Sequence, residues 1–149
     1  MTNPSGGASR FSGRKLAALH NLSAEGPIQV RVRGGCMDPV LADGELASVE
    51  RRRIYWPGDV IVFQATDGLR AHRLLGYRPT REGLAAVTRP DASIDAWDAP
   101  VQRREILGRV TAVESGAALH VSFGQRLRSI GRFVSLASRK LFKREVPAT

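Results

Sequence analysis

One cysteine and one histidine are the residues of this chain best suited to covalent chemistry. Cys36 is the only cysteine among 149 residues, and it follows two glycines and precedes Met37-Asp38-Pro39. A thiol on such a turn is placed for contact with a ligand rather than for packing in a core. His72 is the only histidine between residues 36 and 119. Because an imidazole can take the proton of a thiol, this pair predicts hydrolysis through a cysteine nucleophile.

The other residues of the same region limit which side chains can act together with this nucleophile. No lysine lies between residues 36 and 120, which excludes a lysine base within that stretch. A histidine base needs an orienting acid, and one loop offers Asp91, Asp95 and Asp98. One cysteine and three scattered histidines lack the spacing of metal ligands, so we expect neither a metal nor another cofactor.

The apolar pattern predicts a mainly β domain over residues 28–120. Residues 28–32 alternate between apolar and polar side chains, which is typical of a half-buried strand. The Asp67-Gly68 pair lies between two apolar runs and predicts a tight hairpin, with His72 on its return strand. Further strands are expected at 46–49, 60–65, 84–88 and 106–113.

Both ends of the chain differ from this domain. We expect residues 1–27 to be a flexible segment, with a short helix over 10–22. Seven Lys or Arg residues and one acid give residues 121–149 a net charge of +6, whereas eleven Arg and twelve acids leave 36–120 at −1. Apolar residues recurring every three or four positions predict a C-terminal amphipathic basic helix there. They are Phe123, Leu127, Ile130, Val134, Ala137 and Leu141.

Three roles are open for this basic helix. Its apolar stripe can pack on the β domain, or it can lie on an anionic membrane surface, which attracts Lys and Arg. Nucleic acid is the weaker alternative. No run of ~18 apolar residues and no apolar signal segment occurs, and the single cysteine excludes an intramolecular disulfide. We therefore expect a cytoplasmic protein, held peripherally at the inner membrane surface if the helix binds lipid.

Several ordered motifs resemble those of the superfamily of type I signal peptidases and LexA-like self-cleaving repressors. Residues 34–45, Gly-Gly-Cys-Met-Asp-Pro-Val-Leu-Ala-Asp-Gly-Glu, are similar to the pattern Gly-x-Ser-Met-x-Pro-x-Leu-x-x-Gly-Asp, with Cys36 in place of the serine. The other motifs are Pro57-Gly58-Asp59-Val60-Ile61-Val62-Phe63, Ala71-His72-Arg73-Leu74-Leu75, Thr88-Arg89-Pro90-Asp91 and Ile106-Leu107-Gly108-Arg109-Val110.

The resemblance implies a LexA- and signal-peptidase-like antiparallel β fold and a role for each matching residue. Cys36 takes the place of the nucleophile and His72 that of the base, as in family members that use histidine. Asp91 matches the aspartate of its motif. A second acid a few residues further on implies Asp95 or, less favoured, Asp98 as the support of His72.

The same resemblance implies where a substrate would be held. The Cys36 N–H is the expected oxyanion donor, because Gly34 and Gly35 let the chain approach a substrate carbonyl closely. Met37 and Pro39 match the family pattern beside the nucleophile and are expected to contact the substrate.

The predicted function is therefore cleavage of a specific protein or peptide by Cys36 and His72 with a supporting aspartate. The alternative, from a different class, is a non-catalytic peptide-binding module that keeps the same cleft. Self-cleavage of the LexA type is disfavoured, because the chain contains no Ala-Gly dipeptide, the typical scission site in that branch.

Overall fold

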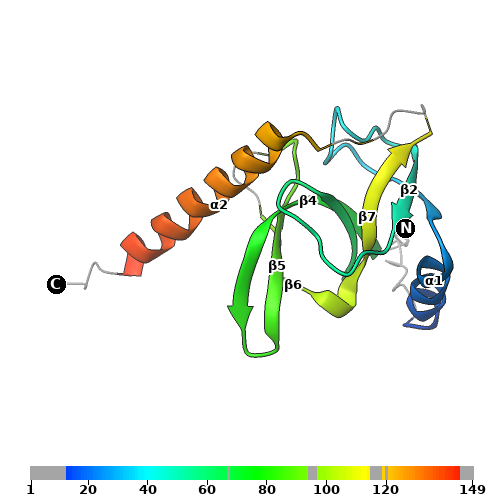
Figure 1. The fold of residues 1–149 in the computed structure, drawn as a ribbon, viewed down its shortest axis with the longest axis horizontal. Helices are drawn as coiled ribbons and strands as arrows, with labels where there is room; N and C mark the ends of the chain where they lie inside the picture. The colour runs from blue at the N-terminus through cyan, green and yellow to red at the C-terminus, as the bar shows by residue number, and fades with distance from the viewer. Residues whose placement is uncertain (1–12, 67, 94–96, 115–118, 120, 145–149) are drawn as a thin grey trace, which may run out of the picture.

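The computed structural model describes residues 13–66, 68–93, 97–114, 119 and 121–144. These residues form a seven-stranded sheet and two α-helices (Figure 1), so the prediction of a mainly β fold is confirmed. A short 3-10 turn spans Arg103–Glu105. The elements are α1 (Gly13–Glu25), β1 (Ile28–Arg31), β2 (Leu46–Glu50), β3 (Val60–Ala65), β4 (Gly68–Thr80), β5 (Gly83–Arg89), β6 (Val101–Gln102), β7 (Ile106–Val113) and α2 (Phe123–Arg144).

The sheet has the strand order β1-β2-β7-β3-β4-β5-β6, and every neighbouring pair is antiparallel. The hairpin predicted from the Asp67-Gly68 pair joins β3 to β4, where Ala65 pairs with Gly68 and Ile61 with His72. His72 therefore lies on the return strand, as predicted. Because side chains alternate along a strand, the sheet buries apolar residues on both faces. One core cluster contains Val62, and the other contains Ile61.

The close approach of β7 to β2 gives a stability prediction. A Cβ on Gly108 would lie 2.7 Å from the Glu50 carbonyl oxygen, so Gly108→Ala forces a backbone shift in a paired strand. We expect the free energy of unfolding to fall by ~1–3 kcal/mol in chemical denaturation. Gly26→Ala is the matched control, because an added Cβ there has no atom within 4 Å. Equal stability of the two variants would contradict the prediction.

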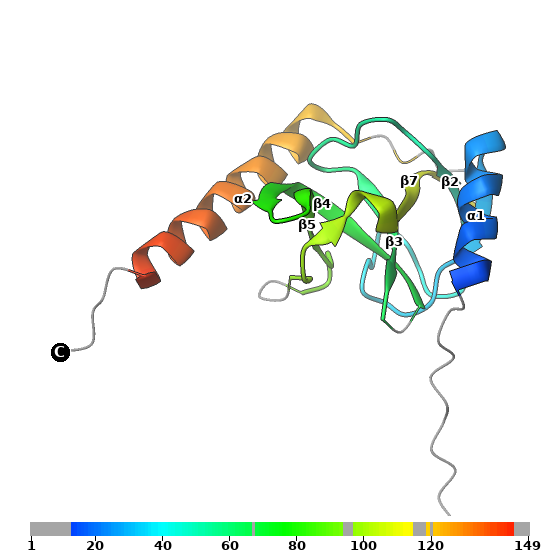
Figure 2. The same ribbon diagram turned by 90° about the horizontal axis from the view of Figure 1, so that it is seen from below.

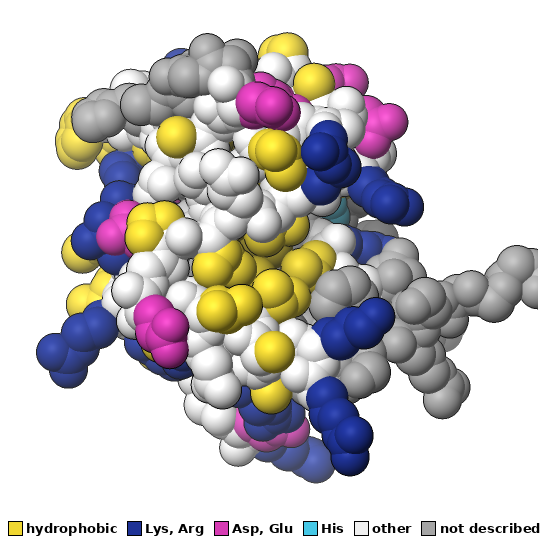
Figure 3. Space-filling model, turned by 90° about the vertical axis from the view of Figure 1, so that its right-hand side faces the viewer, with side chains coloured by type: hydrophobic (Ala, Val, Ile, Leu, Met, Phe, Trp, Pro, Cys, Tyr) yellow, Lys and Arg dark blue, Asp and Glu magenta, His cyan; other side chains and the backbone are white. Residues whose placement is uncertain are grey.

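α1 covers the first core cluster. It contacts β7, Leu19 packs against the cluster, and Ser23 is buried. Residues 13–25 thus form a helix that docks on the domain, in the region where a short helix over 10–22 is predicted. Residues 1–12 lie outside the described residues. Figure 3 shows this side of the molecule, where hydrophobic side chains gather in the middle and Lys and Arg lie around them.

α2 begins where the sequence predicts and extends for 22 residues. Its first half docks on the sheet, and its second half projects beyond it (Figures 1 and 2). The Phe133 ring lies over Gly76 of β4, where an added Cβ would approach the ring to 3.0 Å. Arg126 Nη1 lies 3.2 Å from Oδ1 of the buried Asp59. An aromatic contact and an ion pair therefore help to attach the helix to the sheet.

The apolar stripe predicted for α2 is not the side that touches the sheet. Phe123 is 77% exposed, Leu127 53%, Ile130 43% and Val134 57%, and we call these four residues the α2 stripe. Ser129, in contrast, is buried. The interpretation that the stripe packs on the β domain is therefore wrong for these four residues. Ala137, also predicted for the stripe, lines a pocket together with Val87 of β5, and the side chain of Leu141 lies outside the described residues. Neither described helix combines the length and apolar character that a bilayer-crossing segment needs.

Candidate active site

A loop between β1 and β2 carries Cys36. The Gly44 N–H donates to the Val32 carbonyl at 2.9 Å and closes this loop. Gly34 has a φ of +86°, a conformation that side chains disfavour. Its N–H donates to the Asp43 carboxylate at 2.8 Å. That donor supports the loop itself. A Cβ at Gly34 would have no atom within 4 Å, and the expectation that this glycine lets a substrate carbonyl approach closely stays a prediction.

Two buried side chains anchor the Cys36 turn, which we define as residues 36–40. Met37 and Leu41 are 0% exposed and belong to the first core cluster. Met37 is therefore a core residue, which corrects the expectation that it contacts a substrate. Gly35 and Pro39 are exposed around this turn, and substrate contact by both stays a prediction.

The Cys36 turn lies beside the strand that carries His72. Cys36 is half-buried and packs against the first core cluster, which includes Ala71 of β4. Its carbonyl accepts a hydrogen bond of 3.0 Å from the Ala92 N–H. The turn is thereby tied to the first core cluster and to the segment that follows β5.

Asp91 forms an ion pair with Arg73, not with His72. Arg73 Nε donates to Asp91 Oδ1 at 2.8 Å, and Arg73 Nη2 donates to Asp91 Oδ2 at 2.5 Å. The two side chains are only 10% and 17% exposed. The prediction that Asp91 supports His72 is therefore wrong. Its bidentate pair instead holds the segment after β5, including the Ala92 N–H, in place.

Asp98 is the acid that bonds to His72. His72 Nδ1 lies 2.5 Å from Asp98 Oδ2, and the same oxygen accepts a hydrogen bond of 2.7 Å from the Thr88 hydroxyl. The His72 and Asp98 side chains are 6% and 12% exposed, and Arg70 lies 3.7 Å from the second Asp98 oxygen. Asp98, the least favoured of the three predicted acids, is thus the one that contacts His72. Asp95 lies outside the described residues.

The charge of Asp98 determines the tautomer of His72. Burial alone raises the pKa of Asp98, but hydrogen bonds from His72 and Thr88 and the charge of Arg70 outweigh burial, so the pKa lies below its ordinary value. An ionised carboxylate only accepts hydrogen bonds, so Nδ1 of His72 must donate. In the neutral imidazole, the lone pair then lies on Nε2.

Cys36 rests as a neutral thiol. Burial raises the pKa of Cys36, and the charges of Asp98 and Asp38 add to this, whereas its own backbone N–H and Arg70 lower it by less. Between the described side chains of Cys36 and His72 there is no hydrogen bond. The raised pKa therefore disfavours a thiolate at Cys36 near neutral pH.

This protonation state predicts how Cys36 reacts without substrate. The rate of alkylation by iodoacetamide is expected to keep rising with pH beyond ~8.5, the ordinary pKa of a free cysteine, because the raised pKa leaves little thiolate at neutral pH. Intact-mass spectrometry over a pH series measures the rate at this single cysteine, with a short cysteine peptide as the reference. A plateau at lower pH than that of the peptide would show an activated thiolate and contradict the prediction.

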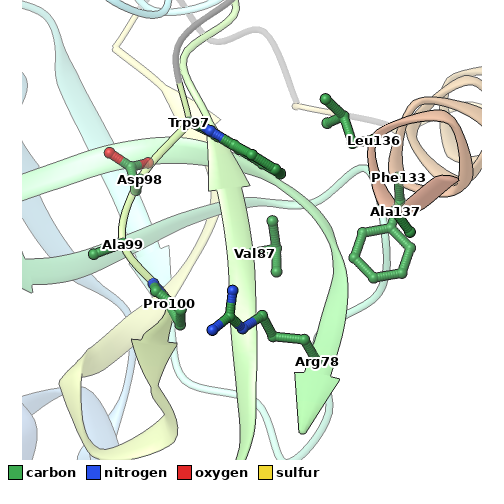
Figure 4. A pocket seen from close by; sticks show the side chains of 9 residues that line it. All are labelled: Arg78, Val87, Trp97, Asp98, Ala99, Pro100, Phe133, Leu136 and Ala137. Atoms are coloured by element: carbon green, nitrogen blue, oxygen red, sulfur yellow. The ribbon is translucent and has the colours of Figure 1, made fainter. Parts of the chain in front are cut away.

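A pocket of about 450 Å³ opens beside Asp98, between α2 and β5 (Figure 4). Phe133 and Leu136 line it from α2, and the Trp97 ring extends from the opposite side toward the helix. Arg78 lies at its edge. The mostly apolar lining with few polar groups suits an apolar side chain of a ligand.

Sequence reasoning missed Thr88, Arg70 and Arg73 as parts of this network. Thr88 is 0% exposed, and a buried threonine on a strand is ordinarily read as a core residue. The feature that could have revealed their role is the pairing of β4 with β5. It brings Leu74 opposite Thr88 and Arg73 opposite Arg89. That register places the aspartate-rich loop next to His72.

No protein-family model matches this chain, and no curated protein matches it either. In the part of the chain that the structure describes, no group of three His, Cys, Asp or Glu side chains is placed to hold a metal ion. The candidate active site is therefore defined by its own geometry: the Cys36 turn, the His72 ring, and the Asp98 carboxylate that His72 and Thr88 both contact.

Proposed function

We propose that this chain is a cysteine peptidase-like hydrolase of the signal peptidase and LexA-like superfamily, which cleaves a specific protein or peptide. The hydrogen bond between His72 and Asp98 beside the Cys36 turn carries the proposal. An imidazole held by an ionised carboxylate is what a general base requires. The order of the motifs and the antiparallel sheet support the superfamily assignment.

The proposed reaction follows from the positions of the protons. Nε2 of His72 takes the Cys36 proton as the sulfur attacks the substrate carbonyl carbon, and Asp98 stabilises the resulting imidazolium. The imidazolium then gives the proton to the leaving amine, which leaves a thioester. Water attacks the thioester with His72 as base, which releases the carboxylic acid and restores the thiol.

The oxyanion formed in this reaction needs a donor beside the sulfur. The Cys36 N–H lies close enough to its own thiol to lower the pKa of that thiol. A donor at this position also reaches the oxygen on the carbon that the sulfur attacks. In this proposal, Gly35 serves by leaving the backbone accessible, because it is exposed and has no side chain.

The pocket beside Asp98 is the proposed subsite for an apolar substrate residue. It adjoins the acid of the catalytic network, and Phe133 and Leu136 give it apolar walls. An extended peptide that passes the Cys36 turn would then place one apolar side chain between α2 and β5.

A non-catalytic peptide-binding module is the second candidate. The raised pKa of Cys36 and the missing hydrogen bond between Cys36 and His72 favour it, because both describe a thiol that is not activated at rest. This candidate keeps the pocket and the loop but forms no thioester.

A peptide library separates the two candidates. The protein and its Cys36→Ala variant are incubated with peptides from a digested proteome, and new termini are identified by mass spectrometry. We expect new termini only with the unsubstituted protein, with apolar residues enriched near the cut. Retention of the same peptides by both proteins without new termini would reject hydrolysis and establish the binding module.

A further inference from the structure

We infer that α2 holds this protein against an anionic membrane surface, with the α2 stripe inserted among the lipid headgroups. The stripe residues are spaced by four, three and four positions, so they share one face of the helix. All four are large apolar side chains, and each is at least 43% exposed. Single exposed apolar residues are ordinary, but a continuous line of them indicates an interaction surface.

The contacts of α2 with the sheet leave this face open. Ser129 and Phe133 face β4, and Arg126 Nη1 reaches Asp59 and also donates to the Pro57 carbonyl at 3.3 Å. None of these residues belongs to the α2 stripe. The second half of the helix projects beyond the sheet (Figures 1 and 2). A flat surface can therefore approach the stripe without displacing the helix from the body.

The charge of α2 identifies the chemistry of the partner. Seven Lys or Arg residues and no acid lie between residues 121 and 144. Arg128 and Arg132 are exposed on this helix. An apolar stripe on a helix with a basic polar face is the pattern of interfacial helices that bind anionic bilayers. Each basic residue near such a surface strengthens binding about fivefold, which corresponds to ~1 kcal/mol.

Other occupants fit the helix less well. A second copy packed on the stripe would bring two segments of net charge +6 together. Nucleic acid would bind the arginines but gain nothing from four apolar side chains.

An exposed tryptophan also favours a membrane surface. Trp56 is 59% exposed and precedes Pro57, whose carbonyl accepts a hydrogen bond from Arg126 in the first turns of α2. Tryptophan is enriched at membrane–water interfaces.

Vesicle co-sedimentation of the full chain tests this inference independently of any peptidase activity. The probe is vesicles of equimolar phosphatidylglycerol and phosphatidylcholine, compared with vesicles of phosphatidylcholine alone. We expect the protein to sediment with the anionic vesicles only. The bound fraction should fall as salt rises from ~0.01 M to ~1 M, because the Debye length shrinks from ~30 Å to ~3 Å.

Two pairs of matched variants locate the surface. The Leu127→Ser/Val134→Ser variant is expected to weaken vesicle binding at least tenfold. Its control is Leu22→Ser/Leu84→Ser, which removes leucines that are 53% and 66% exposed elsewhere and should bind within about twofold of the unsubstituted chain.

A second pair of variants, with its own control, tests the contribution of the arginines. Arg128→Gln/Arg132→Gln should weaken binding by up to about 25-fold, the product of about fivefold for each arginine. Arg53→Gln/Arg81→Gln removes the same charge from exposed positions outside α2 and should have a smaller effect.

Three results would overturn the inference. The first is equal binding by the Leu127→Ser/Val134→Ser variant and its control. The second is binding to phosphatidylcholine alone as strong as to the anionic vesicles. The third is a lipid-free dimer in analytical ultracentrifugation that the stripe variant dissociates, because the stripe would then belong to a second copy of the chain.

Discussion

Cys36→Ala is expected to lower the rate of peptide cleavage by at least ~10⁴-fold, because it removes the atom that forms the thioester. The rate is measured on a library peptide that the unsubstituted protein cleaves. Cys36→Ser is expected to keep measurable activity, since Nε2 of His72 can activate a hydroxyl as well as a thiol. The two variants together separate loss of the nucleophile from damage to the loop.

Ala42→Ser is the matched control for these variants, because Ala42 is exposed on the same loop and has no role in the proposed chemistry. Thermal unfolding shows whether each variant keeps its fold. If folded Cys36→Ala cleaves the peptide within about tenfold of the unsubstituted rate, Cys36 is not the nucleophile.

Asp98→Asn is expected to lower kcat by ~10²–10⁴-fold with a smaller effect on KM. The amide cannot stabilise the imidazolium, and it also donates hydrogen bonds, which favours the wrong tautomer of His72. Steady-state kinetics on the same peptide measure the effect. Glu82→Gln removes one exposed carboxylate far from the chemistry and should leave kcat unchanged. A kcat for Asp98→Asn equal to that of the Glu82 variant would show that the hydrogen bond to His72 is structural only.

The stability of the same Asp98 variant gives a readout that needs no substrate. The folded pKa of Asp98 lies below its ordinary value, so its ionised form is favoured by folding. Its contribution to stability is therefore fully present above the ordinary pKa of an aspartic acid and is lost as the pH falls through the lower folded pKa. Unfolding measured from neutral to acidic pH should show a smaller decline for Asp98→Asn. An unchanged decline would mean that Asp98 is not held ionised by its partners.

Local patterns were sufficient to predict the elements that surround the site. Alternation in residues 28–32 and the Asp67-Gly68 pair predicted β1 and the β3–β4 hairpin, because strand alternation and tight turns depend on neighbouring residues. The same holds for α2, whose three- and four-residue spacing predicted a helix from Phe123.

The supporting acid could not be predicted in this way. Asp91, Asp95 and Asp98 lie in one loop, and their side chains are chemically identical. Only the pairing of β4 with β5 brings Arg73 against Asp91 and the His72 ring against Asp98.

The sequence by itself determined the candidate nucleophile and base, the strands that carry them, and the amphipathic character of α2, since each is a property of residue type and short-range spacing. Tertiary structure alone decided which aspartate meets His72, that Met37 is buried in the core, and that the α2 stripe faces away from the sheet. These outcomes depend on contacts between residues far apart in the chain. For α2 the deciding contacts are those of Phe133 with Gly76 and Arg126 with Asp59, which fix the rotation of the helix about its own axis.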